Sequence, residues 1–196
     1  MALKELLKEI NIDKEFEHRC QTFITLLQQW GKVHNLSGRL DKEDIIENIE
    51  DSIYPLKFIE KYESFADIGT GAGYPGLILA MANANAKAYL IEPRLKRVSF
   101  LNFVKNTLEL KNVEVIANRV EKINDIKVDL ITSRAVTNTK LLLDLTTNIK
   151  KDDTAYLFYK GTLLEDEIQQ VKINNYDVVN RKDRNYLYIK KENNDF

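Results

Sequence analysis

The sequence predicts an α/β fold: a mainly parallel, doubly wound sheet that follows a helical cap and ends in an antiparallel hairpin. Three observations predict it. Short β-rich runs alternate with helical segments from residue 63 onward, apolar residues recur at helical spacing before that point, and two closely spaced β-rich runs end the chain. The 196 residues suffice for one α/β domain and a small extension. We expect the cap over residues 1–62 and the α/β domain over residues 63–196.

The predicted cap contains apolar residues at spacings of three and four. They are Phe16, Cys20, Phe23, Leu27 and Trp30. This spacing places them on one buried face of a helix. Gly31 follows the last of them and is expected to end that helix. The cap shows no strand pattern, so we expect helices throughout it.

The predicted sheet has five β-rich runs separated by helical segments. The runs are residues 65–68, 88–91, 113–116, 128–132 and 155–159. Helical crossovers between successive strands are typical of a parallel sheet. Two further runs, residues 176–179 and 186–189, are separated by only six polar or charged residues. This spacing predicts a hairpin, hence an antiparallel strand in the sheet.

Composition and charge limit the classes of protein that the sequence can encode. Apolar residues make up 44% of the chain and the net charge is −1, so an RNA partner would need a local basic patch. No apolar run approaches a membrane span, and the first residues lack the pattern of a signal peptide. Cys20 is the single cysteine, which leaves neither an internal disulfide nor a second thiol for a metal. We expect a cytoplasmic monomer without a metal ion.

A glycine-rich loop is the most informative segment. It spans residues 67–76, between the first predicted strand and an apolar helix, and its glycines Gly71, Gly73 and Gly76 have the spacing G-x-G-x-x-G. Such glycines permit a sharp turn and a close approach of a ligand to the backbone. Glu92 ends the second strand, where an acid accepts hydrogen bonds from ribose hydroxyls. These features fit NAD as well as S-adenosylmethionine.

Asp67 distinguishes between these two cofactors. This carboxylate precedes the loop directly. It would repel a pyrophosphate but favour the cationic ammonium and sulfonium groups of S-adenosylmethionine. S-adenosylmethionine is therefore the favoured cofactor. An NAD-dependent oxidoreductase and a nucleotide-sensing module that binds RNA without chemistry remain the alternatives.

The loop also carries a family resemblance. Residues 65–76, Phe-Ala-Asp-Ile-Gly-Thr-Gly-Ala-Gly-Tyr-Pro-Gly, resemble the first motif of the RsmG (GidB) family of bacterial 16S rRNA guanine-N7 methyltransferases. The likeness continues, in the same order, through residues 96–101, 118–121, 133–135 and 160–161. One departure is Glu47-Asn48, where the family often has Arg-His. We carry no RNA or phosphate role over to this pair.

The resemblance implies a Rossmann-like, class I S-adenosylmethionine-dependent methyltransferase. Its implied substrate is a guanine N7 of 16S rRNA, at position 527 in the 530 loop, within the small ribosomal subunit or an assembly intermediate. It further implies that Gly69, Tyr74, Val120, Glu121 and Arg134 line the cofactor site, with Glu92 on the ribose and residues 120–121 near the adenine. With Asp67, Gly71 and Gly73, these complete the predicted cofactor site.

The expected chemistry needs no general base. Guanine N7 carries a lone pair and no proton, so methyl transfer requires alignment and a short approach distance. Arg134 follows the fourth predicted strand, at the edge where open α/β sheets bind ligands. We assign it a positioning role in catalysis.

The candidate RNA contacts are Arg94, Lys96, Arg97, Arg119 and Lys160. The first four belong to residues 94–119, which hold six basic and two acidic side chains. Residues 181–191 form a second candidate patch, with five basic side chains and one acid. Clustered bases suit contacts with phosphates. The alternative interpretation is that both segments are ordinary solvated faces.

Overall fold

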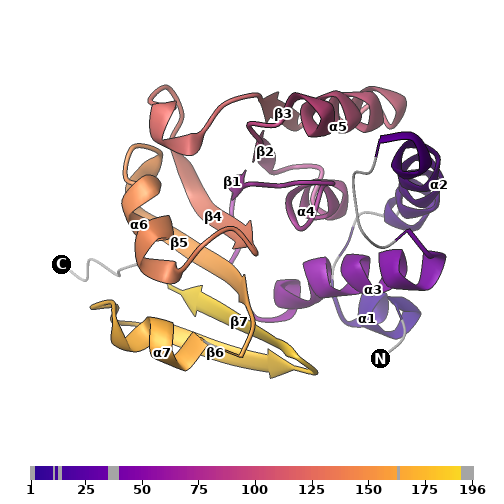
Figure 1. Ribbon diagram of the computed structural model, residues 1–196. Coiled ribbons are helices and arrows are strands. Elements are labelled where there is room, and N and C mark those ends of the chain that lie inside the picture. The colour runs from indigo at the N-terminus through magenta and orange to yellow at the C-terminus, as the bar shows by residue number, and fades with distance from the viewer. Residues whose placement is uncertain (1–2, 11, 13–14, 35–39, 163, 191–196) are drawn as a thin grey trace.

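The computed structural model describes residues 3–10, 12, 15–34, 40–162 and 164–190, with the backbone alone at residues 33 and 34. Its centre is a seven-stranded sheet (Figure 1). The strands are β1 Ser64–Ile68, β2 Lys87–Ile91, β3 Val113–Ile116, β4 Val128–Arg134, β5 Lys150–Lys160, β6 Tyr176–Arg181 and β7 Arg184–Ile189. Each of the seven predicted β-rich runs is therefore part of a strand.

The strand order is β3-β2-β1-β4-β5-β7-β6. Strands β1 to β5 pair in parallel, whereas β7 runs antiparallel to both β5 and β6. The predicted parallel sheet with a C-terminal hairpin is thus confirmed. The order reverses at β1, which has β2 on one side and β4 on the other. Ligands of open α/β sheets bind at such a switch point, beyond the carboxyl ends of the strands.

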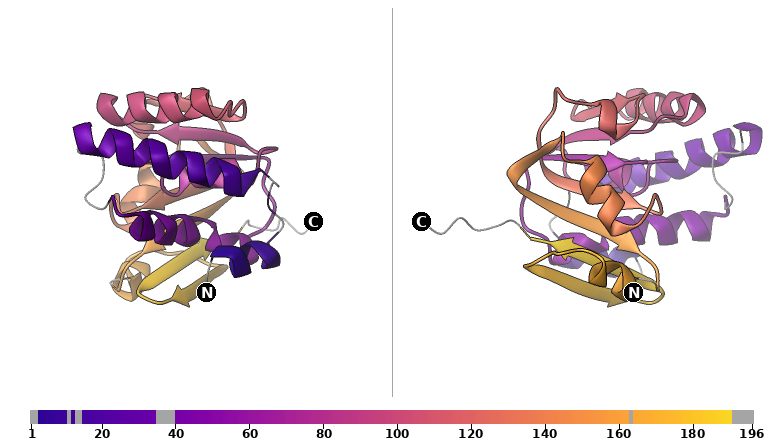
Figure 2. Two further views of the ribbon diagram at one scale, coloured as in Figure 1. Left: turned by 90° about the vertical axis from the view of Figure 1, so that its right-hand side faces the viewer. Right: turned by 60° about the vertical axis from the view of Figure 1, so that its left-hand side comes forward.

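Helices cover both faces of the sheet (Figure 1). One hydrophobic cluster joins α1 Leu3–Glu9, α2 Phe16–His34 and α3 Lys42–Ile53 to α4 Gly76–Ala82 and α5 Leu95–Thr107. A second cluster, on the opposite face, includes residues of η2 Val120–Lys122, α6 Thr139–Leu145 and α7 Leu164–Gln169. Helices α2 and α3 lie side by side on the first face (Figure 2). The short η1, Tyr54–Lys57, then leads to β1.

Where the structure describes the cap, it is mainly helical, as predicted, but Gly31 does not end its long helix. Helix α2 continues to His34. Gly31 is buried, and a Cβ atom there would overlap the side chain of Leu40. Gly31 therefore lets the side chain of Leu40 pack closely against α2, and it is not a C-cap. The expected boundary at residue 62 falls between η1 and β1, although the cap shares its hydrophobic cluster with α4 and α5. None of the helices within the described ranges combines the length and apolar character of a membrane span.

Candidate cofactor site

The glycine loop turns the chain from the end of β1 into α4. Three of its glycines have positive φ: 69° at Gly69, 61° at Gly71 and 107° at Gly73. Residues with a Cβ rarely adopt such angles, which explains the choice of glycine. The amide of Gly69 donates to the Ile91 carbonyl at 2.8 Å, and that of Gly73 donates to the Thr70 carbonyl at 2.8 Å. The loop is thus fixed between the carboxyl ends of β1 and β2.

Asp67 lies beneath this loop and is completely buried. Its Oδ2 accepts a hydrogen bond from the Gly76 amide at 2.9 Å, and its Oδ1 accepts one from the Thr132 hydroxyl at 2.7 Å. Burial raises the pKa of the Asp67 carboxyl to about 6, although these hydrogen bonds and the charge of Arg134 act to lower it. The carboxylate therefore fixes the start of α4 and, when ionised, places a negative charge directly under the loop.

Glu92 directly follows the neighbouring strand β2, and its exposed fraction is 2%. Its Oε2 accepts a hydrogen bond from the Gly71 amide at 3.0 Å, and its Oε1 accepts one from the Arg94 amide at 2.9 Å. The Arg97 guanidinium lies 3.4 Å from Oε2. Two backbone amides thus hold the carboxylate at the carboxyl end of β2, where the sequence predicted a ribose contact.

A pocket of about 310 Å³ opens beside these residues. Four of the predicted cofactor residues line it, namely Gly69, Glu92, Val120 and Glu121. Its apolar walls come from the ends of β1 and β2, from the segment after β4 and from the end of α6: Ile68, Ile91, Val136 and Leu145. An acid beside apolar walls suits the ribose and the base of a nucleoside. A larger recess, about 640 Å³, lies at the amino ends of β1 and β4 and is lined by none of the predicted site residues.

The pocket includes residues that the sequence did not predict. Ala135 and Val136 follow β4, and Asn118 precedes η2. A Cβ placed on Gly69 would lie 2.6 Å from a methyl group of Val136, so this side chain closes over the glycine loop. The signal for these residues was their position just beyond the carboxyl ends of parallel strands, which is where such sheets bind ligands.

The other predicted cofactor residues support the pocket from outside its lining. Gly71 binds Glu92 through its amide. Tyr74 is buried, and its ring packs edge-to-face against Phe23 of the cap, with the ring centres 5.6 Å apart. The guanidinium carbon of Arg134 lies 4.8 Å from the centre of the Tyr74 ring. Arg134 therefore joins the glycine loop to the end of β4.

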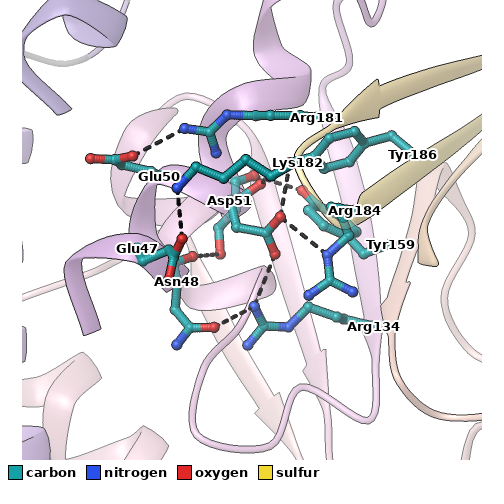
Figure 3. A network of polar contacts seen from close by, with 11 residues as sticks. Glu47, Asn48, Glu50, Asp51, Arg134, Tyr159, Arg181, Lys182, Arg184 and Tyr186 are labelled. Carbon is teal, nitrogen blue, oxygen red and sulfur yellow. Dashed lines mark hydrogen bonds and ion pairs between the residues drawn. The ribbon is translucent and has the colours of Figure 1, made fainter. Parts of the chain in front are cut away.

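Arg134 also contacts the cap, as Figure 3 shows. Its Nη1 donates to Oδ1 of Asn48 at 2.8 Å and to Oδ2 of Asp51 at 3.1 Å. From the sequence, residues 47–48 are only a departure from the family's Arg-His, and no role is predicted for them. Their proximity to Arg134 could not be predicted, because 86 residues separate Asn48 from Arg134.

The predicted RNA contacts have different environments. Arg94, Arg97 and Arg119 line the pocket, and the side chain of Arg119 is 71% exposed. Lys96 is exposed and is the second residue of α5. Lys160, by contrast, is buried. Its Nζ donates to the Thr137 carbonyl at 2.9 Å and to Glu167 at 2.8 Å. We therefore leave Lys160 out of the proposed RNA surface, because its charge is already paired beneath the surface.

The second candidate patch is largely neutralised by acids. Its basic residues pair as Arg181 with Glu50, Lys182 with Glu47, Arg184 with Asp51 and Lys190 with Asp177. The fifth base, Lys191, lies outside the described residues. Three of these pairs attach the hairpin to α3 of the cap. The candidate bases that remain are those around the pocket, on residues 94–97 and 119, where Arg97 lies 3.4 Å from Glu92 and Arg119 lies 3.9 Å from Glu121.

The chain is similar to known proteins of one family. The family model for GidB, rRNA small subunit methyltransferase G, matches residues 17–194. A ribosomal RNA small subunit methyltransferase G from Aliarcobacter butzleri is 67% identical over 96% of this chain and 98% of its own length. The protein of the same name from Wolinella succinogenes is 42% identical over 95% of this chain and 97% of its own length.

Several solved methyltransferases have a similar fold. One from Geobacter sulfurreducens has a TM-score of 0.63 at 12% identity and covers 86% of this chain and 90% of its own. The T. thermophilus 16S rRNA N2 G1207 methyltransferase RsmC, solved with AdoMet and guanosine, has a TM-score of 0.58 at 15% identity and covers 80% of this chain and 44% of its own. At these identities, the likeness shows the Rossmann-like methyltransferase fold. With the family match over nearly its whole length, the chain belongs to the rRNA small subunit methyltransferase G (GidB) family.

Proposed function

We propose that this chain transfers the methyl group of S-adenosylmethionine to N7 of a guanine in 16S rRNA. The observation that carries the proposal is the pocket at the switch point of the sheet, where two buried acids, Asp67 and Glu92, flank a glycine loop. Membership of the family supplies the substrate class. The ionised Asp67 disfavours a pyrophosphate at this loop, which argues against the NAD-dependent alternative.

The residues of the pocket divide the binding task. Glu92 would accept hydrogen bonds from the ribose hydroxyls, and Val120 and Glu121 would lie against the adenine. The ionised Asp67 would stabilise positive charge above the loop, although its oxygens already bind the Gly76 amide and the Thr132 hydroxyl. S-adenosylmethionine, when bound, supplies a methyl group on a cationic sulfur.

The chain contributes alignment and no proton transfer to the reaction. Because guanine N7 is an unprotonated lone pair, its methylation requires an in-line approach to the methyl group and no general base. In a paired A-form stem N7 lies in a deep, narrow groove, so we infer that the base is taken from a loop. The basic side chains around the pocket, Arg94, Lys96, Arg97 and Arg119, would contact the neighbouring phosphates.

The decisive experiment measures transfer of a labelled methyl group to three substrates: free 16S rRNA, small-subunit particles and assembly intermediates. Cleavage of the product RNA after borohydride and aniline treatment identifies 7-methylguanosine and its position. We expect label in at least one 16S-containing substrate, with cleavage at a single guanine. Label found only in protein or in tRNA would refute the substrate assignment.

Binding measurements test the cofactor independently of the RNA. Calorimetry should detect binding of S-adenosylmethionine and none of NAD. The opposite result would restore the oxidoreductase alternative. Binding of S-adenosylmethionine and rRNA without any methyl transfer would favour the nucleotide-sensing module. An rRNA substrate supports a cytoplasmic location, and we propose that the protein acts there as a monomer.

A further inference from the structure

Helix α3 of the cap reaches the glycine loop through a chain of specific contacts. The chain begins at Arg134, whose Nη1 carries two hydrogens and has two acceptors, Asn48 Oδ1 at 2.8 Å and Asp51 Oδ2 at 3.1 Å. Figure 3 shows the guanidinium of Arg134 directed at these two side chains. The side chain of Arg134 is 15% exposed and that of Asp51 is 10% exposed, so water screens the ion pair only weakly.

The amide of Asn48 has one orientation that satisfies its neighbours. Its Nδ2 donates to the Asp44 carbonyl at 2.8 Å, one turn earlier in the same helix. Exchanging the oxygen and nitrogen of the amide would set two donors against each other at Arg134 and two acceptors at Asp44. The helix backbone therefore fixes the Asn48 oxygen toward Arg134.

The carboxylate of Asp51 is fixed from its other side. Its Oδ1 accepts hydrogen bonds from the Tyr186 hydroxyl at 2.8 Å and from Nε of Arg184 at 3.2 Å, both in β7 (Figure 3). The neighbouring Ser52 carbonyl accepts a 2.6 Å hydrogen bond from the Tyr159 hydroxyl. Because β5 and β7 hold α3 here, Asp51 presents its second oxygen to Arg134 without freedom to turn away.

Arg134 passes this constraint to the glycine loop. Its guanidinium lies over the Tyr74 ring at 4.8 Å, a favourable cation–π distance, while Phe23 of α2 contacts the same ring. The Tyr74 amide donates to the Thr70 carbonyl at 3.0 Å, so the position of the ring is coupled to the turn at residues 70–74. The cap thus holds Tyr74 by two separate contacts.

We propose that Asn48 and Asp51 are positioning residues: by orienting Arg134 against Tyr74, they set the glycine loop for the cofactor. The proposal deepens the proposed function and rests on it for the identity of the cofactor. The constraint on the loop itself exists in the free protein. It can therefore be measured without any ligand.

The first experiment is amide hydrogen exchange of the free protein over residues 69–76. We expect Asn48→Ala to raise hydrogen exchange in this segment and to weaken S-adenosylmethionine binding about tenfold. This is the scale for losing one charge-assisted hydrogen bond, because Arg134 keeps Asp51 as its second acceptor. Glu47→Gln is the matched control. Glu47 lies on the same helix as Asn48, and its replacement removes an exposed ion pair with Lys182 of the hairpin, in which the two side chains are 54% and 58% exposed. This variant should leave hydrogen exchange and S-adenosylmethionine binding unchanged.

The second experiment uses Asn48→His. A neutral imidazole can accept from Arg134 and a protonated one cannot, so binding relative to wild type should be near normal at pH 8 and fall toward that of Asn48→Ala below about pH 6. The charged groups around this position are Asp44, Glu47 and Asp51 on α3, Arg134 on β4, and Arg181, Lys182, Asp183 and Arg184 on the hairpin. Unfolding temperatures are recorded for each variant, which separates a loss of folding from a loss of positioning.

The two proposals fail in different ways. Two results would each overturn the positioning role. The first is that Asn48→Ala and Glu47→Gln show the same hydrogen exchange and the same S-adenosylmethionine binding. The second is that the affinity of Asn48→His, relative to wild type, does not change with pH. If hydrogen exchange is faster in Asn48→Ala but the wild-type protein methylates no 16S substrate, the two proposals separate. The exchange result would support the coupling of the cap to the loop, and the missing methylation would refute the proposed function.

Discussion

Replacing Asp67 with Asn should stabilise the protein and weaken cofactor binding. The Asp67 pKa rises from 3.8 to about 6 on folding, chiefly because the side chain is buried. About two pKa units at 1.36 kcal/mol each correspond to about 3 kcal/mol by which ionised Asp67 disfavours the folded state. Asn resembles the protonated acid, with one acceptor for the Gly76 amide and one donor for the Thr132 oxygen. We therefore expect a gain of about 2–3 kcal/mol in the free energy of unfolding at pH 7.

The sign of the pH dependence provides the test. Between pH 3.8 and about 6 the folded state binds more protons at Asp67 than the unfolded state does, so this residue lowers stability as the pH rises. The difference between Asp67→Asn and wild type in urea unfolding should be near zero at pH 4 and largest at pH 7. Other titrating groups are shared by the two proteins and cancel in the difference. A difference that does not vary with pH would refute the assignment of a buried, destabilising carboxylate.

Asp129→Asn is a control with the opposite sign. Hydrogen bonds and an ion pair with Lys151, together with hydrogen bonds from Ser64, outweigh burial and lower the pKa of Asp129. Its ionised form therefore stabilises the fold, fully above its unfolded pKa and less as the pH falls through its lowered folded pKa. This substitution should reduce stability at pH 7.

Calorimetry completes the test for Asp67→Asn, since the lost charge should weaken S-adenosylmethionine binding by about 1–3 kcal/mol.

Three further predictions concern individual residues. Glu92→Ala should also weaken S-adenosylmethionine binding by about 1–3 kcal/mol, and unchanged affinity by calorimetry in a folded variant would place the ribose elsewhere. Gly76→Ala should lower the unfolding temperature, because the added Cβ would lie 2.5 Å from the Asp67 carboxylate and 2.7 Å from a methyl group of Leu90. A melting curve that matches wild type would contradict this packing. Burial raises the pKa of the Cys20 thiol to about 12, so a thiol reagent at pH 8 should label the native protein slowly and the urea-unfolded protein quickly, whereas equal rates would show that Cys20 is accessible.

Local patterns were sufficient to predict most of the fold. Alternating β-rich and helical segments predicted the five parallel strands, and two further β-rich runs joined by a short polar segment predicted the antiparallel hairpin. The glycine loop was predicted equally well, because positive φ angles favour glycine, and three of the loop's glycines adopt them. These features depend on neighbours in the sequence, which a single chain displays directly. The end of α2 was the exception, because Gly31 serves packing against Leu40 and not the helix terminus.

The roles of charged side chains were decided by the tertiary structure. The sequence placed Asp67 and Glu92 correctly at strand ends, but it could not show that both carboxylates are buried and bound by backbone amides. Nor could it show that Lys160 is paired with Glu167, or that Asn48 accepts a hydrogen bond from Arg134. A charge acts through its burial and its nearest partners, and those partners come from distant parts of the chain. The sequence by itself thus determined the elements and the loop, whereas only folding determined which charges remain available to a ligand.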